Sequence, residues 1–270
     1  MISVIIPTLN EEKFLPKLLD SLVAQTRKNF EVIVVDGQSQ DKTVAVAQSY
    51  AKKLPKLQVM VSAKANLPLQ RNLGAKAARG DWLVFVDADG ILMPYFIDRI
   101  DNFIKKTSPN WFSTWCLPDS DSSNDAIVTL LVNIYWESTV LIKRPVAPGP
   151  LNCIRTDVFH SVGGYNEEQK YNEDVELGLH LDRIGAKLTF LRETLYVWSM
   201  RRIRRENKIK VMNQYIVSLI PILLFKRPFK VMPGYTMGGH AYTNKQKSQI
   251  AKLLRSYEKS LKRFAKELFE

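Results

Sequence analysis

The spacing of apolar and polar positions changes repeatedly over the first third of the chain. Short, mostly apolar runs occur at residues 2–6, 31–35, 57–61 and 82–86. Runs of this length, rich in β-branched side chains, are typical of strands covered on both faces. The stretches between them have apolar residues at helical intervals of three and four; they are residues 11–27, 41–53 and 69–79. Repeated strand–helix–strand units predict an α/β fold with a mostly parallel sheet and helices on both faces.

The second half of the chain is less regular. Three prolines and a glycine within residues 145–150 indicate a loop, and residues 151–155 restart ordered structure. A helix is expected over residues 175–184, directly after Asn172-Glu173-Asp174. Residues 250–268 place apolar side chains opposite a lysine-rich face, which predicts an amphipathic helix.

Composition is that of an ordered globular protein, with 46% hydrophobic and 24% charged residues in a chain of 270. Cys116 and Cys153 match no zinc-binding spacing, so we expect two buried thiols in a reducing compartment. The opening residues lack the basic region and cleavage site of a signal peptide. No apolar stretch reaches the roughly 20 residues needed to span a bilayer. We therefore expect a cytoplasmic location.

The formal net charge of +12 is concentrated at one end. Residues 199–270 hold 17 Lys and Arg against 4 Asp and Glu, a balance of +13, whereas residues 1–198 carry −1. Basic residues 201–205 lie near an apolar run at 215–225, which is typical of peripheral attachment to an anionic cytoplasmic membrane face. A solvated helical face, or contact with a donor or acceptor diphosphate, are the alternatives. Nucleic acid is not expected as a partner, because no aromatic residues are interleaved with the charges.

Polar segments stand where the predicted strands end. Residues 7–12, 36–41 and 87–89 follow strands, and residues 70–72 open the third predicted helix. Ligands of open α/β sheets bind beyond the carboxyl ends of the strands. We therefore expect the functional site to be built from these four segments.

Asp87 and Asp89 are the strongest candidates for chemistry. Two carboxylates separated by one residue at the exit of an apolar strand are unfavourable unless a positive charge neutralises them. Oxygen ligands on a short loop suit Mg²⁺ or Mn²⁺, which would bridge to phosphate oxygens. The alternative is a turn in which the aspartates accept backbone N–H groups.

The other segments have structural as well as functional explanations. Asp36 is suited to accept hydrogen bonds from a base or a ribose hydroxyl, while Asp41 is expected to cap the second helix. Asn10 is a suitable cap for the first helix. At the predicted start of the third helix, Arg71 is a cation within reach of a diphosphate, although an arginine on a helix is commonly solvated.

Taken in order, the segments read VIIPTLNEE at 4–12, VVDGQSQDKT at 34–43, RNLGA at 71–75 and GDWLVFVDAD at 80–89. In this order and spacing they resemble the family-2 inverting glycosyltransferases of the GT-A fold. The resemblance covers roughly residues 1–200 and is strongest in the first half of that range. It implies transfer of one sugar from a UDP- or GDP-linked donor to a saccharide or lipid-linked acceptor.

The resemblance also implies a division of the chain. Residues 1–113 would form the nucleotide-sugar-binding half and residues 114–198 the acceptor-binding and catalytic half. Residues 199–270 would form a basic helical C-terminal extension.

The same resemblance implies roles for individual residues. Asp89 would bind the metal, and Asp87 would contact the ribose or a metal-bound water. Arg71 would lie near the base or the diphosphate. The residues that would contact the base and ribose are Pro7, Thr8, Asn10, Glu11 and Asp36.

Glu173 and Asp174 resemble the acidic pair of the same family, in which Asp174 would deprotonate the acceptor hydroxyl. Inversion requires one base opposite the leaving diphosphate, and the metal would stabilise charge on that diphosphate. The structural alternative is a charged first turn of a helix.

Two departures from the family limit the prediction. The Gln-x-x-Arg-Trp element of processive synthases is absent, as are their membrane spans, which favours a single addition. His240, in a glycine turn, is a possible third metal ligand or an ordinary turn residue. We expect no chemistry from His160 and His180, which fall in helical patterns.

Two other functions share this kind of fold. A sugar-nucleotidyltransferase would show a glycine-rich phosphate loop after the first strand, where this chain has residues 7–12 without glycine. A non-catalytic, membrane-recruited binding module would not need intact Asp89 and Asp174.

Overall fold

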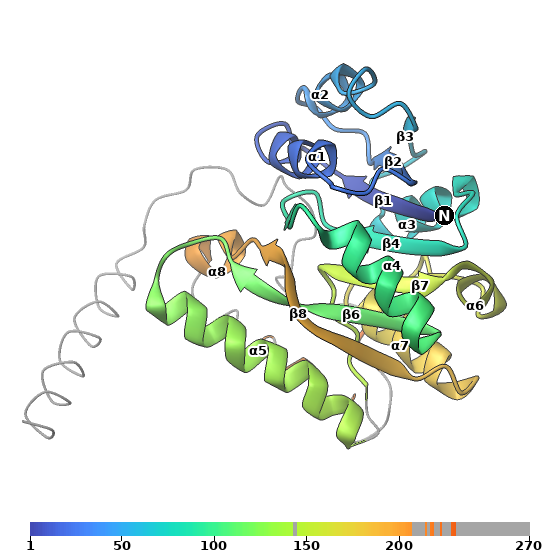
Figure 1. Ribbon diagram of the computed structural model, residues 1–270, viewed down its shortest axis with the longest axis vertical. Helices are drawn as coiled ribbons and strands as arrows, with labels where there is room; N and C mark the ends of the chain where they lie inside the picture. The colour runs from blue at the N-terminus through green and yellow to red at the C-terminus, as the bar shows by residue number, and fades with distance from the viewer. Residues whose placement is uncertain (143–144, 207–213, 215–216, 219–221, 223–227, 231–270) are drawn as a thin grey trace, which may run out of the picture.

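One mixed sheet organises the described part of the protein (Figure 1). The computed structural model describes residues 1–142 and 145–206, together with residues 214, 217, 218, 222 and 228–230. In this part, eight strands take the order β3-β2-β1-β4-β7-β6-β8-β5. The strands are β1 (Ile2–Thr8), β2 (Phe30–Asp36), β3 (Leu57–Val61), β4 (Trp82–Val86), β5 (Ile91–Leu92), β6 (Trp111–Pro118), β7 (Leu151–Arg155) and β8 (Leu188–Trp198). The helices are α1 (Leu15–Val23), α2 (Thr43–Ser49), α3 (Leu67–Ala77), α4 (Phe96–Thr107), α5 (Ser123–Leu141), α6 (Thr156–Ser161), α7 (Glu173–Arg183) and α8 (Arg201–Arg205).

The first four long strands pair in parallel, as the apolar pattern predicts. Val4 of β1 lies opposite Val32 of β2 and Val84 of β4, and all three side chains are buried. Every residue of these three strands is buried, because helices cover both faces of the sheet. The predicted α/β architecture is confirmed.

Two apolar cores lie on the two faces of the sheet. Ile2, Val4 and Ile6 of β1 point into a core with α1, α2, α4 and α5. Ile5 points the other way, into a core with residues of α3 and α6. The period of two along a strand therefore separates these two sets of helices, whereas α7 contributes Val175 and Leu179 to the first core and Leu177 and Leu181 to the second.

Two helix starts differ from the prediction. Asn10 does not cap α1: it adopts a left-handed φ of 55°, and Phe14 holds the capping position. Helix α3 begins before residue 69, because the side chain of Asn66 accepts the N–H of Leu69 at 2.8 Å and a proline follows the cap. Arg71 consequently lies inside the helix and not at its start.

The predicted cap of α2 is displaced by one residue. Lys42 holds the capping position, whereas the carboxylate of Asp41 accepts the N–H of Thr43 at 2.9 Å. The acidic side chain still satisfies a free N–H group at the start of the helix.

The second half of the chain reverses one strand. β7 runs antiparallel to both β4 and β6, while β6 and β8 pair in parallel. The reversal brings the loop that precedes β7 to the edge where β4 ends, and Asp87 N–H donates to the carbonyl of Pro150 at 3.1 Å. Residues separated by more than sixty positions thus meet at one end of the sheet.

Helix α5 buries three polar side chains together with Trp136 and turns other apolar side chains outward. On the buried side, Asn133 accepts the N–H of Cys116 and donates to its carbonyl, at 3.1 and 3.0 Å. On the other side, Ile127, Leu131 and Ile134 are 56%, 59% and 50% exposed. Their spacing of three and four residues makes this one continuous apolar face.

Several predictions concern residues at or beyond the edge of the described part. The division after residue 113 falls inside β6, so the two predicted halves share one sheet and their separate roles remain predictions. His240, the helix at 250–268 and most of the run at 215–225 lie outside the described residues. Both cysteines are free and buried, as expected. None of the helices formed by the described residues is long and apolar enough to cross a membrane.

Candidate active site

The loops after β1 and β2 are tied to each other by short side-chain contacts. Asp36 is 1% exposed, and its Oδ1 accepts hydrogen bonds from the hydroxyls of Thr8 and Ser39 at 3.0 and 2.6 Å. Asn10 accepts the N–H of Gln40 at 2.8 Å, and its own N–H donates to Ser39. Pro7 lies within β1, one residue before Thr8. These predicted donor contacts are therefore gathered in one place, where Asp36 also organises its own loop.

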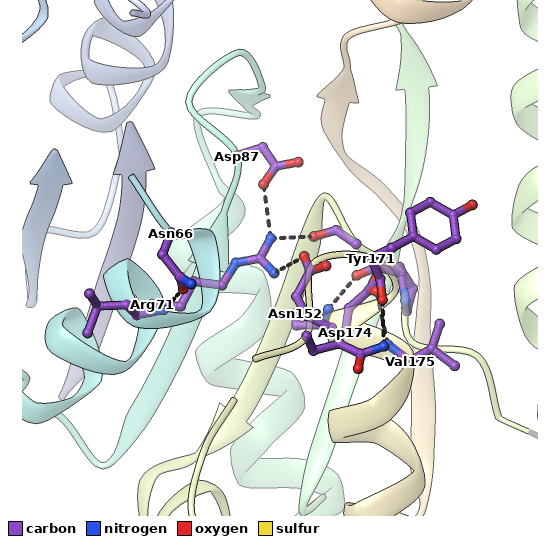
Figure 2. A network of polar contacts seen from close by, with 12 residues as sticks. Asn66, Arg71, Asp87, Asn152, Tyr171, Asp174 and Val175 are labelled. Carbon is purple, nitrogen blue, oxygen red and sulfur yellow. Dashed lines mark hydrogen bonds and ion pairs between the residues drawn. The ribbon is translucent and has the colours of Figure 1, made fainter. Parts of the chain in front are cut away.

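Arg71 joins the end of β4 to the start of α7 (Figure 2). Its side chain is 2% exposed, and Nη1 donates to Glu173 at 2.9 Å. Nη2 donates to Asp87 at 3.2 Å and to the carbonyl of Gly149 at 3.3 Å. The guanidinium also lies over the ring of Tyr165, 5.1 Å from its centroid. Arg71 thus positions two acidic side chains, whereas its predicted contact with the donor stays a prediction.

Asp174 lies in the first turn of α7, beside this network (Figure 2). Its Oδ1 accepts the N–H of Val175 at 2.9 Å, and its Oδ2 faces Gly149 so closely that a Cβ there would lie 2.7 Å away. Burial, followed by the charge of Glu173, raises the pKa of Asp174 to about 7. A carboxyl with this pKa can take up a proton near neutral pH, as a general base requires.

Glu11 and Asp89 are linked by Arg201, one of the basic residues 201–205 for which contact with a diphosphate is an alternative in the sequence analysis. Arg201 donates to both oxygens of Glu11, at 2.8 and 2.5 Å, and its Nε lies 2.9 Å from Oδ2 of Asp89. Burial raises the pKa of Glu11 to about 7 although Arg201 opposes the shift, and burial also raises the pKa of Asp89. Buried carboxylates are stabilised by a neighbouring cation, and the basic residues 201–205 are a source of one that the sequence shows.

The carboxylates at the end of β4 have the chemistry of a hard-cation site without a complete set of ligands. No group of three or more His, Cys, Asp or Glu able to hold a metal occurs among the residues that the structure describes. The guanidinium of Arg201 nevertheless shows that a positive charge is accommodated next to Asp89. Asp87, which faces Arg71, has a pKa raised by burial, so additional positive charge would favour its ionised form. Asp89 and Asp87 therefore fit a divalent cation, and their role as ligands stays a prediction.

A comparison with protein families agrees with this geometry. The model of glycosyl transferase family 2 matches residues 3–140, which include the ends of β1, β2 and β4 and Arg71. The chain belongs to glycosyl transferase family 2.

Proteins similar to this chain occur in bacteria. The chain is 31% identical over 185 residues to an uncharacterised glycosyltransferase of Haemophilus influenzae, covering 67% of this chain and 62% of that one. It is also 31% identical over 175 residues to a PGL/p-HBAD biosynthesis glycosyltransferase of Mycobacterium tuberculosis, covering 62% of this chain and 63% of that one. The match thus spans about three fifths of the length of these two relatives.

Solved structures of glycosyltransferases share the fold. The crystal structure of S. aureus TarS 1–349 with UDP-GlcNAc matches with a TM-score of 0.60 and 22% identity over 74% of this chain and 58% of that chain. Mannosyltransferase PcManGT from Pyrobaculum calidifontis, in complex with GDP-Man and Mn²⁺, matches with a TM-score of 0.58 and 19% identity, covering 73% and 56%. The predicted GT-A-type fold of this family-2 glycosyltransferase is confirmed.

The raised pKa of Asp174 predicts a specific pH dependence of stability. The folded protein keeps this proton up to about pH 7, whereas the unfolded chain loses it near pH 4. The free energy of unfolding of the wild type should therefore fall as the pH rises through this interval. In Asp174→Asn this contribution is absent, so the variant should gain on the order of 1–2 kcal/mol relative to the wild type between pH 4 and pH 8.

Urea denaturation in EDTA at several pH values measures this difference. The offset between the two proteins at pH 4 serves as the internal reference, because it contains every effect of the substitution except the titration. Stability curves that stay parallel across the interval would contradict the assignment.

Proposed function

We propose that this family-2 glycosyltransferase moves one sugar from a nucleotide-diphosphate sugar to an acceptor hydroxyl, with inversion at the anomeric carbon. The observation that carries the proposal is the position of Asp174. Its carboxyl, with a pKa of about 7, belongs to the residue next to Glu173, and Arg71 pairs with both Glu173 and Asp87. A base placed beside a donor-binding carboxylate in this way is suited to an attack opposite the leaving group.

The nucleotide is proposed to bind across the ends of β1 and β2. Thr8, Asn10 and Asp36 are already organised there by mutual hydrogen bonds, so little order would be lost on binding. TarS structures contain UDP or UDP-GlcNAc, and the PcManGT structure contains GDP-Man. These ligands support a UDP- or GDP-linked donor for the present chain.

A divalent cation, Mg²⁺ or Mn²⁺, is proposed to bind Asp89, with Asp87 beside it. Such an ion, when bound, would stabilise negative charge on the leaving diphosphate. The Mn²⁺ in PcManGT supports this choice. His240 remains a proposed third ligand on sequence grounds only.

Asp174 is proposed to accept the proton of the acceptor hydroxyl. Glu173 pairs with Arg71 at the start of α7, and the absence of a side chain at Gly149 lets Oδ2 of Asp174 lie where a Cβ would be only 2.7 Å away. A nucleotidyltransferase would not need a base at this position, and a non-catalytic module would not hydrolyse a donor. Donor hydrolysis in the absence of acceptor therefore separates the proposed function from both alternatives.

The acceptor is proposed to be lipid-linked or close to a membrane, at an anionic cytoplasmic surface. The apolar face of α5 supports this proposal in addition to the positive charge of the C-terminal extension. Arg204 of α8 contacts Asp125 in the first turn of α5, so the basic extension begins next to the apolar face. A helix whose apolar side faces outward beside a basic segment is suited to the interface of an anionic bilayer.

Loss of the base should reduce turnover without loss of donor binding. For Asp174→Asn we expect turnover to fall by about 10²–10⁴-fold, which is the usual contribution of a general base. Transfer or donor hydrolysis measures turnover, and calorimetry measures nucleotide affinity. Asp157→Asn is the matched control, because its carboxylate is 68% exposed on α6 and pairs with Arg155. Near wild-type turnover of Asp174→Asn would assign the base elsewhere, with Glu173 tested next.

Removal of the metal ligand should abolish the effect of cations on nucleotide binding. The wild type should bind UDP or GDP more tightly with Mn²⁺ than with EDTA, by at least about tenfold. Asp89→Asn should show little difference between the two conditions. Asp98→Asn on α4 is the control and should behave as the wild type. A cation effect that persists in Asp89→Asn would contradict this ligand.

Charges on the apolar face of α5 should weaken membrane attachment. Leu131→Glu combined with Ile134→Glu should reduce binding to anionic vesicles by more than about tenfold, because two side chains can no longer be buried. Co-sedimentation at low and high salt measures binding, and salt should weaken it further. Ile184→Glu is the control, since Ile184 is 54% exposed outside α5. Equal binding to neutral and anionic vesicles, or none to either, would contradict the proposal.

A further inference from the structure

Arg201 connects two acidic side chains that lie on the loops after two different strands. Its guanidinium contacts Glu11, after β1, and Asp89, after β4. The side chains of Arg201, Glu11 and Asp89 are 13%, 7% and 16% exposed, so water screens these charges only weakly. The guanidinium also lies over Phe14, 4.4 Å from the ring centroid, which fixes its plane.

Arg201 and the proposed divalent cation would contact the same carboxylate, that of Asp89. The cation is proposed above to bind Asp89, whose Oδ2 lies 2.9 Å from Nε of Arg201. A guanidinium and a metal ion on the same carboxylate would repel each other strongly at such short separation, because little solvent lies between them. This repulsion favours separation of the guanidinium from Asp89 when the cation binds.

We propose that Arg201 is a positioning residue that competes with the divalent cation for Asp89. In the absence of the cation, its guanidinium neutralises Asp89 and Glu11 and holds the two loops together. When the cation binds, the guanidinium leaves Asp89 and keeps its two hydrogen bonds to Glu11. The inference rests on the proposed metal dependence of the transferase and adds a residue from the C-terminal extension to the donor site.

The surroundings of Arg201 allow a local exchange. The N–H of Met200 donates to Asp119 at 3.1 Å, and Arg204 also pairs with Asp119. The ring of Trp198 packs against Trp136 of α5, with centroids 6.2 Å apart. These contacts anchor α8 independently of Asp89, so the exchange needs a movement of the Arg201 side chain and not of the helix.

Titration with Mn²⁺ alone tests the competition. The electron paramagnetic resonance signal of free Mn²⁺ gives the affinity of each protein without any nucleotide. Arg201→Met should bind Mn²⁺ at least about tenfold more tightly than the wild type, since one charge-assisted pair no longer has to be broken. Arg201→Lys keeps the charge and should remain close to the wild type.

Arg204→Met is the matched control. Arg204 lies on the same helix and pairs with Asp119 and Asp125, away from Asp89, so its loss should leave Mn²⁺ affinity unchanged. Equal or weaker Mn²⁺ binding by Arg201→Met, or no binding by either protein, would overturn the proposal. So would Arg201→Lys binding as tightly as Arg201→Met.

A measurement on the wild type covers the case in which Arg201→Met does not fold. The Nε–H resonance of Arg201, identified by its loss in Arg201→Lys, should shift as Mg²⁺ is added, and an unchanged resonance would overturn the proposal. No sugar donor is present in these experiments. Their failure would leave donor hydrolysis and the effect of Asp174→Asn standing, whereas failure of those assays would leave the cation competition intact.

Discussion

The burial of several carboxylates is the main constraint at the end of the sheet that carries the proposed site. Glu11, Asp87, Asp89, Glu173 and Asp174 gather there. In the described part of the chain, Arg71 pairs with Asp87 and Glu173, and Arg201 pairs with Glu11 and Asp89. Burial nevertheless raises the pKa of Glu11, Asp87, Asp89 and Asp174. The end of the sheet is thus held in a state that favours additional positive charge or protons.

Arg71 can pair with Asp87 and Glu173 because of its position in the fold. Helix α3 packs against β1 and β2 with Gly74 facing Ile5, where a Cβ would meet the isoleucine at 2.4 Å. This close approach brings the helix, and Arg71 with it, down onto the sheet. The reversed strand β7 and the start of α7 then supply the carbonyl of Gly149 and the carboxylate of Glu173. A single buried side chain in this way fixes the separation between the end of β4 and the start of α7.

The sequence alone predicts the elements that are determined by local residue patterns. Doubly covered strands such as β4 are unbroken apolar runs, and parallel pairing brings the residues after them to one edge, so Asp36, Asp87 and Asp89 could be grouped in advance. The start of α3 was misplaced because the cap at Asn66 was overlooked, although its chemistry is visible in the sequence. The contact of Arg201 with Glu11 spans 190 positions, and no periodicity encodes a pairing of that range. The inward polar face of α5 was equally hidden, because its partners lie on β6.

The reversal of β7 also has a consequence for how such a chain can diverge. Strands β1 to β4 come from the first ninety residues, and the part that follows is attached through the β4–β7 ladder, whose register is fixed by five residue pairs. The excursion between β4 and β7 contains α4, β6 and α5, and β6 returns to pair with β7 at Trp111 and Phe112. Insertions can therefore be accommodated in the exposed turns of this excursion, whereas a shift of β6 would disturb the sheet. β7 thus limits where the chain can change in length without loss of the sheet.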